Sequence, residues 1–220
     1  MISDELLDYA EKHSTSEYPF LERLNRETNL TQVYPRMLAG PMQGLLLRFI
    51  SQMIQPRRVL EIGTFTGYSA INLAMGLIST LQEEGILHTI EVEPEQEDLI
   101  RQYLKEAGLV QKVILHIGEA MKIIPTLDET WDLVYIDADK SNYLNYYKLI
   151  FDRVRPGGFI LADNVLWDGK VLNSNTRSRD THGIIDFNDF VMQDDRVENL
   201  LLPFRDGVMI VRKNPGHKVK

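Results

Sequence analysis

The sequence predicts an α/β fold with a mostly parallel sheet covered by helices on both faces, and two patterns carry this prediction. Beginning at Val59, short apolar segments alternate with segments of helical periodicity, which is typical of a parallel sheet packed between helices. The last two apolar segments are joined by a turn that contains Asp206-Gly207, and Asp-Gly is typical of a hairpin. We therefore expect the sheet to end in an antiparallel pair.

Helices are expected ahead of the sheet. Residues 1–12 and 18–29 place apolar side chains on one helical face, and residues 42–55 carry a wide apolar stripe that should face a core. The 220 residues contain no repeat, low-complexity tract or linker. We therefore expect one domain, with N-terminal helices in residues 1–56 and an α/β core in residues 57–213.

The core elements follow in order along the chain. The first strand starts at Val59, ends at Gly63 and leads through a turn into a helix at 68–75. Further strands are expected at 86–92, 113–117, 131–136 and 159–162, with helices at 94–107 and 142–153 and a short one from Ala120 that ends at Pro125. Pro156-Gly157-Gly158 should form the turn before the fifth strand.

The last part of the chain changes in composition. Residues 169–183 are polar, and we interpret them as one long loop that is either a lid or disordered. Residues 184–192 can form a helix, and strands are expected at 197–202 and 208–212.

Composition and charge exclude several classes of function. The net charge is −8 and the sequence pI about 5.2, which disfavours a broad nucleic-acid-binding surface. Without cysteines, disulfides, thiolate metal sites and cysteine nucleophiles are excluded. The histidines lack metal-ligand spacing. The start of the chain is acidic rather than signal-like, and no apolar segment approaches the ~20 residues that span a bilayer, so we expect a cytoplasmic protein.

The turn after the first strand is a candidate ligand site, because a strand, a glycine turn and a helix in that order aim backbone amides at a ligand. Gly63 and Gly67 bracket the turn, and Phe65 stands where dinucleotide-binding folds have the middle glycine of G-x-G-x-x-G. This disfavours a nicotinamide dehydrogenase and indicates a ligand without a pyrophosphate. An ordinary strand–helix junction is the alternative.

Acidic side chains follow the predicted strands, where open parallel sheets bind ligands. They are Glu61, Glu91, Glu119, Asp137, Asp139 and Asp163. Acids gathered at one edge need a cation or a hydroxyl-rich ligand to compensate their repulsion. Glu91 can accept hydrogen bonds from both hydroxyls of a ribose, with a solvated surface acid as the alternative.

Asp137, Asp163 and Asn164 offer three oxygen ligands from two strand ends. Mg²⁺ binds oxygen and keeps several waters, so three protein oxygens suffice; helix capping and a turn are the alternative use of these residues. Lys140 can reach the same pocket, where a neighbouring dication would disfavour its ammonium form and make it a usable base. Its role depends on these neighbours, because most lysines are solvated surface charges.

Three motifs carry a family resemblance. Residues 61–69 are Glu-Ile-Gly-Thr-Phe-Thr-Gly-Tyr-Ser, residues 137–143 are Asp-Ala-Asp-Lys-Ser-Asn-Tyr, and residues 163–169 are Asp-Asn-Val-Leu-Trp-Asp-Gly. In this order they closely resemble the cation-dependent O-methyltransferases that use S-adenosylmethionine, the group of plant caffeoyl-CoA and animal catechol O-methyltransferases. The likeness extends from about Met37 to Arg212.

The resemblance implies a Rossmann-like class I methyltransferase fold of seven strands with a reversed last strand, and commonly a homodimer. It implies that S-adenosylmethionine is held by Glu61, Gly63, Ser69, Glu91, Ala120, Asp137 and Asp139, with Glu91 on the ribose and Ala120 beside the adenine. It also implies that Asp137, Asp163 and Asn164 bind a divalent cation (Mg²⁺, or else Mn²⁺ or Ca²⁺), that Lys140 is the general base beside Asp137, and that Trp167 walls the aromatic acceptor.

One region departs from the family pattern. Residues 37–44 are Met-Leu-Ala-Gly-Pro-Met-Gln-Gly, whereas plant members have Met-Thr-Thr-Ser followed by Asp-Glu-Gly. Hydroxyls beside the metal and an acid near the amino-acid end of the cofactor are missing. Gln43 or backbone groups would have to substitute for them, so plant-type acceptor specificity does not follow from the resemblance.

The expected reaction is methyl transfer from S-adenosylmethionine to a hydroxyl of a catechol-like vicinal diol, with the metal acidifying the hydroxyl and Lys140 taking its proton. A close alternative is 5-hydroxyuridine in tRNA, which also presents two oxygens and which loop residues Lys170, Arg177 and Arg179 would favour. A non-catalytic cofactor-binding or dimerisation module is the third interpretation. The joint presence of the cation ligands and Lys140 disfavours it.

Overall fold

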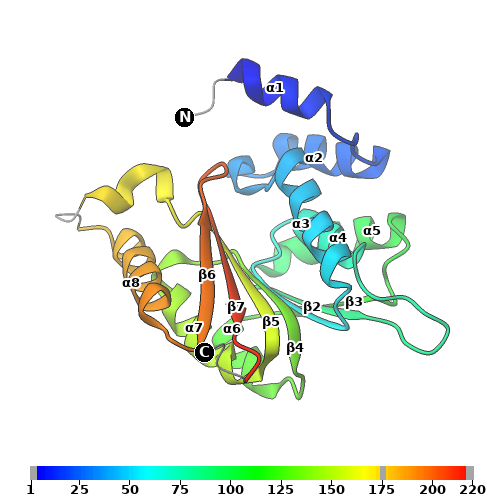
Figure 1. The fold of residues 1–220 in the computed structure, drawn as a ribbon. Helices are drawn as coiled ribbons and strands as arrows, with labels where there is room; N and C mark the ends of the chain where they lie inside the picture. The colour runs from blue at the N-terminus through cyan, green and yellow to red at the C-terminus, as the bar shows by residue number, and fades with distance from the viewer. Residues whose placement is uncertain (1–3, 174–176, 217–220) are drawn as a thin grey trace.

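The structure is a computed structural model that describes residues 4–173 and 177–216. The described residues form a seven-stranded sheet of order β3-β2-β1-β4-β5-β7-β6 (Figure 1). The strands are β1 (Arg58–Ile62), β2 (Ile86–Glu91), β3 (Val113–Ile117), β4 (Trp131–Ile136), β5 (Val154–Asp163), β6 (Val197–Leu202) and β7 (Val208–Lys213). Neighbours among β1–β5 are parallel, and β7 is antiparallel to β5 and β6. The α/β class and the antiparallel end are thus confirmed.

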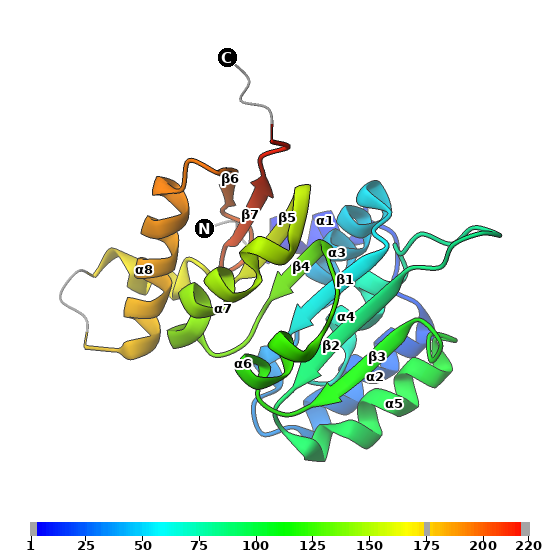
Figure 2. The same ribbon diagram turned by 90° about the horizontal axis from the view of Figure 1, so that it is seen from below.

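Helices cover both faces of the sheet (Figure 2). One face carries α2 (Pro19–Thr31), α3 (Pro41–Ile54), α4 (Tyr68–Ala74) and α5 (Glu97–Glu106), and the other carries α6 (Ala120–Ile123), α7 (Tyr143–Ile150) and α8 (Arg179–Gln193). Each face has its own buried apolar core. Helix α1 (Asp4–Lys12) keeps Leu6 and Tyr9 exposed.

Short 3-10 helices join these elements. They are η1 (Pro35–Met37), η2 (Pro94–Gln96), η3 (Ile124–Thr126), η4 (Lys140–Asn142), η5 (Phe151–Arg153) and η6 (Trp167–Leu172). No helix among the described residues is long and apolar enough to span a membrane.

The fifth strand is longer than predicted. β5 continues through Pro156-Gly157-Gly158, which we predicted to be a turn. The pairing of β5 with β4 shifts register between Trp131 and Leu133, and such a bulge accommodates a proline and glycines inside a strand. Residues 155–158 have no partner in the β4 register and Gly157 has φ +76°, so the predicted turn is retained as an irregularity inside the strand.

The prediction of one long loop at 169–183 was also wrong. Helix η6 extends to Leu172, and α8 begins at Arg179. The hydroxyl of Ser178 accepts a hydrogen bond from the amide of Thr181 at 3.3 Å, which is an N-cap. Because residues 169–183 are polar in composition, the sequence pattern did not distinguish the Ser178 cap from a loop. Residues 174–176 of the predicted loop lie outside the described residues.

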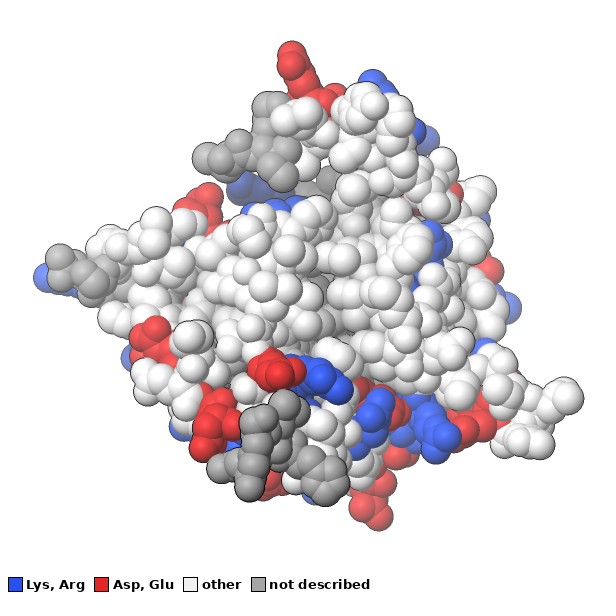
Figure 3. Space-filling model, viewed as in Figure 1, with Lys and Arg blue, Asp and Glu red and all other residues white. Residues whose placement is uncertain are grey.

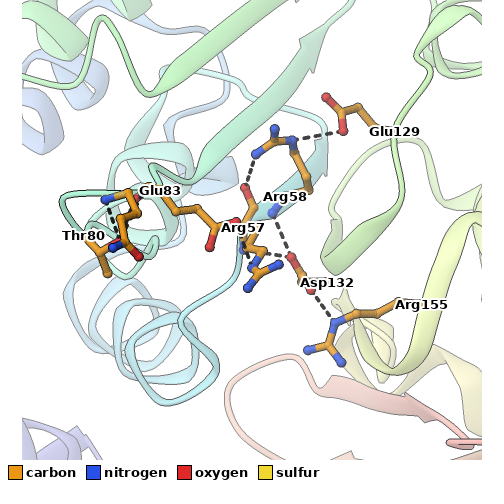
Figure 4. A network of polar contacts seen from close by, with 8 residues as sticks. Arg57, Arg58, Thr80, Glu83, Glu129, Asp132 and Arg155 are labelled. Atoms are coloured by element: carbon orange, nitrogen blue, oxygen red, sulfur yellow. Dashed lines mark hydrogen bonds and ion pairs between the residues drawn. The ribbon is translucent and has the colours of Figure 1, made fainter.

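A polar network joins the amino ends of β1, β4 and β5 (Figure 4). Asp132 accepts hydrogen bonds from the amides of Arg57 and Arg58 at 2.8 and 2.9 Å and from the guanidinium of Arg155. Nε of Arg58 lies 3.0 Å from Glu129. A cavity of about 390 Å³ opens here, but its charged side chains largely pair with one another, so we assign it a role in joining strands.

Two histidines near the sheet edge form a titratable pair. His88 of β2 and His116 of β3 stack with ring centroids 5.3 Å apart, and Nδ1 of His88 is 3.0 Å from Nε2 of His116. Burial lowers the pKa of both side chains, and the proximity of His116 lowers the pKa of His88 further. Glu129, 3.9 Å from His88 Nε2, opposes the shift, whereas Arg58 adds to it.

This pair should lose stability on acidification. Because the folded-state pKa values lie below the ordinary value of about 6.5, the unfolded chain binds more protons below that pH and stability falls as the pH falls. Burial raises the pKa of Glu61 to about 8, which makes the free energy of unfolding increase as the pH falls. A variant that removes only the histidine pair is therefore needed to separate the two effects. We expect the urea midpoint to fall more steeply from pH 7 to 5 in the wild type than in His116→Gln. The exposed His13→Gln variant should follow the wild type; equal slopes in wild type and His116→Gln would refute this account.

Candidate functional site

A cavity of about 1290 Å³ opens at the carboxyl ends of β1 to β5. Segment η1–α3 and the turn between β6 and β7 complete its wall. It is lined by, among others, Gly63, Ser69, Glu91, Ala120, Asp137, Asp139, Lys140, Asp163, Asn164 and Trp167. The structure therefore brings together ten of the eleven site residues that the family resemblance implied.

The glycine turn fits against the end of β4. Gly63 has φ +95°, and a Cβ placed on it would lie 2.1 Å from the carbonyl oxygen of Asp137. Only glycine permits this approach. The amides of Thr64 and Phe65 donate to Oε2 of Glu91 at 3.2 and 2.6 Å, so this carboxylate fixes the turn and lines the cavity at once.

Glu61, the eleventh residue, lies behind the cavity wall. Its side chain is fully buried and accepts a hydrogen bond from the hydroxyl of Thr89 at 2.5 Å, while its Oε1 has no partner among the described residues. Burial raises the pKa of Glu61 to about 8, against the opposing effects of the neighbouring hydroxyls of Ser69 and Thr89. At neutral pH this carboxyl is therefore mostly protonated.

Ser69, Ala120 and Asp139 lie at separate places on the wall. Ser69 is in the first turn of α4, and Ala120 begins α6. Asp139 is exposed, and its carboxylate accepts hydrogen bonds from the hydroxyl of Tyr146 and, at 2.5 Å, from the amide of Asn142. All three are positioned by elements that follow different strands.

Asp137 and Asp163 face the same part of the cavity. They follow Ile136 and Ala162, which are paired in the β4–β5 register. Burial raises the pKa of Asp163, and the charge of Asp137 raises it further, so the two carboxylates are close enough to repel each other. Asn164 follows directly, with φ +57°, and also lines the cavity.

Side chains from other elements hold Asp163 through only one of its two oxygens among the described residues. Its Oδ2 accepts hydrogen bonds from the buried amide of Gln43 and, at 3.1 Å, from the hydroxyl of Tyr135. Its Oδ1 accepts a hydrogen bond from the amide of the adjacent Asn164, at 2.8 Å. No group of three His, Cys, Asp or Glu in the described residues is arranged to hold a metal; the set here is two carboxylates and one amide. Such oxygen donors, with an unrelieved repulsion between the carboxylates, fit a hard dication.

Lys140 is a buried cation beside this set. Its Nζ donates to Oδ1 of Asp137 at 2.8 Å and to the hydroxyl of Tyr143 at 2.6 Å. The Tyr143 hydroxyl in turn donates to the carbonyl oxygen of Asp163 at 2.9 Å. The Trp167 ring lies with its centroid 5.9 Å from Nζ. The ammonium thus links both strand ends and faces an aromatic wall.

Sequence reasoning missed several residues of the site. Tyr143 stands three residues after Lys140, a spacing that places two side chains on one face of a helical turn, so it could have been found. Arg36 and Arg205 line the cavity without any such local signal. In contrast, the loop cations Lys170, Arg177 and Arg179 are not among the described residues that line it.

Comparisons with known proteins agree with this geometry. Residues 11–214 match the family model described as O-methyltransferase. Catechol O-methyltransferase domain-containing protein 1 of Mus musculus is 34% identical over 94% of this chain and 79% of its own length. Catechol O-methyltransferase of Niastella koreensis is 36% identical over 70% of each chain. The structure of the O-methyltransferase TomG from Streptomyces achromogenes in complex with SAM superposes with a TM-score of 0.89, at 28% identity, over 97% of this chain and 100% of that one.

Proposed function

Because this chain belongs to the O-methyltransferase family and is an S-adenosylmethionine-dependent O-methyltransferase with the class I fold, we propose that it methylates one hydroxyl of a small aromatic vicinal diol and that a divalent cation is required. The observation that carries the proposal is the shared wall formed by Asp137, Asp163, Asn164 and Lys140. Oxygen donors for a cation and a candidate base lie there beside the glycine turn.

S-adenosylmethionine would occupy the part of the cavity next to β1 and β2, where it supplies the methyl group on its sulfonium. Gly63 leaves space that a Cβ would fill, and Glu91 lines the cavity with both oxygens held by backbone amides. Oε2 already accepts two amides, whereas Oε1 accepts one and keeps a lone pair for a ribose hydroxyl. Ser69, Ala120, Asp137 and Asp139 would complete this site, and the buried Glu61 would support it from behind.

Asp163 would present Oδ1 to the cation, because Gln43 and Tyr135 occupy Oδ2. Asp137 would present Oδ2, because Lys140 occupies Oδ1, and Asn164 would add its amide oxygen. When bound, Mg²⁺ or a similar dication supplies Lewis acidity to the acceptor hydroxyls. The side chain of Gln43, which bonds to Asp163, would thus substitute for the hydroxyls that plant members carry beside the metal and that residues 37–44 lack here.

Lys140 would act as the general base at Nζ. Its hydrogen bonds to Asp137 and Tyr143 fix two directions on this nitrogen and leave a third for the acceptor hydroxyl. Trp167 would hold the aromatic ring against the same side of the cavity. Most of the rate enhancement would come from this alignment and from charge placement.

The proposal is tested by measuring transfer of labelled methyl from S-adenosylmethionine to catechol, to phenol and to bulk tRNA, each with Mg²⁺ and with EDTA. We expect turnover of catechol with Mg²⁺ alone. If phenol were methylated as fast as catechol, the enzyme would not require a vicinal diol. Incorporation into tRNA but not into catechol would instead favour the 5-hydroxyuridine reaction.

A homodimer is also proposed. Phe49 and Met53 of α3 and Leu200 of β6 are exposed, Met53 by 75%. Figure 3, in the view of Figure 1 that shows α3 and β6, has mostly residues other than Lys, Arg, Asp and Glu over its middle and charged residues of both signs along its lower edge. Burying such apolar area would favour self-association. Sedimentation of the wild type at a dimer mass, and of Met53→Glu at a monomer mass, is expected; a monomeric wild type would disprove the dimer.

A further inference from the structure

Two arginines at the cavity wall are not used by the reaction described above. Arg36 of η1 and Arg205 of the β6–β7 turn both line the cavity. The other Lys or Arg among the described lining residues is Lys140, which is paired with Asp137. Neither Arg36 nor Arg205 forms one of the salt bridges found among the described residues. The cavity thus offers two guanidinium groups to a ligand.

The β6–β7 turn that carries Arg205 is held against the acceptor side of the site. The amide of Leu166 donates to the carbonyl oxygen of Asp206 at 2.8 Å, and the amide of Val165 donates to that of Gly207 at 3.1 Å. A third bond joins the amide of Asp168 to the Asp206 carboxylate. The tied segment, 165–168, includes Trp167 and directly follows Asp163-Asn164, so Arg205 is fixed relative to both.

The guanidinium of Arg205 also lies close to Gly40, on the opposite wall of the cavity. Its Nη1 lies 3.0 Å from the position that a Cβ on Gly40 would take, and Figure 1 shows the β6–β7 turn beside the segment that leads into α3. The backbone of Arg205 is left-handed, with φ +51°, a conformation that is unfavourable for a side chain of this size. Arg205 is exposed as a whole, so its guanidinium stands at the rim of the cavity, against the backbone that leads into α3.

The remaining charge of the cavity is acidic. Glu91, Glu93, Glu119, Asp137, Asp139, Asp163, Asp180 and Asp206 all line it. An anionic substituent on the acceptor would be repelled by this wall except where a guanidinium faces it. Guanidinium groups bind carboxylates through two parallel hydrogen bonds, so a carboxylate on the acceptor would find a complementary group at Arg205 or Arg36.

We infer that the methyl acceptor is a vicinal diol that carries a carboxylate, and that Arg205, assisted by Arg36, binds this carboxylate and determines acceptor specificity. The inference rests on the proposed function, because the diol must be held at Asp163 and Asn164 for its other end to reach Arg205. Arg205 has no part in the chemical step, so its effect should lie in KM rather than kcat.

The test compares 3,4-dihydroxybenzoate with 3,4-dihydroxybenzamide in the wild type and in Arg205→Gln. The wild type should prefer the acid, and this preference in kcat/KM should fall about tenfold in the variant, while turnover of the neutral amide stays unchanged. Arg205→Lys should retain part of the preference. Arg101→Gln, which removes an exposed arginine paired with Glu97 on α5, should behave as the wild type.

Equilibrium binding of benzoate, which lacks the diol, gives a readout independent of turnover and should weaken about tenfold in Arg205→Gln. An unchanged acid-to-amide preference in this variant, with unchanged benzoate binding, would overturn the inference. If the amide is turned over but the acid is not, the inference fails while the proposed function stands. If the wild type turns over neither diol and methylates tRNA instead, the proposed function fails, and the inference with it.

Discussion

Lys140→Met should lower kcat for a vicinal diol by a factor of about 10² to 10⁴, the usual contribution of a positioned general base. Methionine preserves the aliphatic stem of Lys140 but cannot take the hydroxyl proton. Binding of S-adenosylmethionine should change far less than kcat, because Lys140 bonds to Asp137 Oδ1 and Tyr143 and not to the glycine turn, so Asp137 is the one residue of the cofactor site that it contacts. Single-turnover kinetics and calorimetric titration of the cofactor measure the two effects separately.

Two further variants show whether the loss of kcat in Lys140→Met comes from removal of a general base. Lys148→Met makes the same change on α7, where Nζ of Lys148 lies over the Phe190 ring rather than in the cavity, and should keep normal turnover. Tyr143→Phe removes the hydroxyl that orients Lys140 and should also slow the reaction. In the double variant the two losses should not add, since both act through one nitrogen. If Lys140→Met reacted within about threefold of the wild-type rate, Lys140 would not be the general base.

Gly63→Ala should abolish cofactor binding and destabilise the fold by about 3 kcal/mol or more. The new Cβ would lie 2.1 Å from the carbonyl oxygen of Asp137 and 2.7 Å from its carbonyl carbon. The contact is with backbone, so no side-chain rotation relieves it, and either the turn or the end of β4 must move. Both outcomes displace the wall that Asp137 shares with the turn. Urea denaturation and cofactor titration measure the effects.

Gly108→Ala is the matched control for backbone strain. Gly108 has φ +69°, and a Cβ there would meet nothing within 4 Å, so the cost should be about 1 kcal/mol, with normal cofactor binding. If Gly63→Ala cost no more than Gly108→Ala and bound the cofactor normally, the close packing of the turn on β4 would have no functional role.

The proximity of the candidate cation ligands Asp137 and Asp163 could be predicted because it depends on a general rule of parallel sheets. Alternating strands and helices place the strand ends at one edge, and Asp137 and Asp163 each follow a strand that the sequence pattern reveals. Their pairing register, Ile136 with Ala162, then brings them together. No knowledge of side-chain packing was needed for this step.

Other features depend on contacts between distant segments and leave no local signal. Arg205 reaches the cavity only because the β6–β7 turn is bonded to residues 165–168. Gln43 contacts Asp163 across 120 positions of sequence. The pairing of β5 with β4 on both sides of Pro156-Gly157-Gly158, at Val154 and again from Phe159, likewise depends on a second strand. Sequence patterns describe single elements, and these features arise where two elements meet.

The proposed cation site is tested most directly by the anomalous scattering of Mn²⁺ in crystals grown with Mn²⁺ and S-adenosylhomocysteine. We predict one strong peak within coordination distance of Asp137, Asp163 and Asn164, and its absence in crystals of Asp163→Ala. Anomalous density at another place, or none in crystals of an enzyme that methylates catechol, would contradict the assignment of these three residues to the cation.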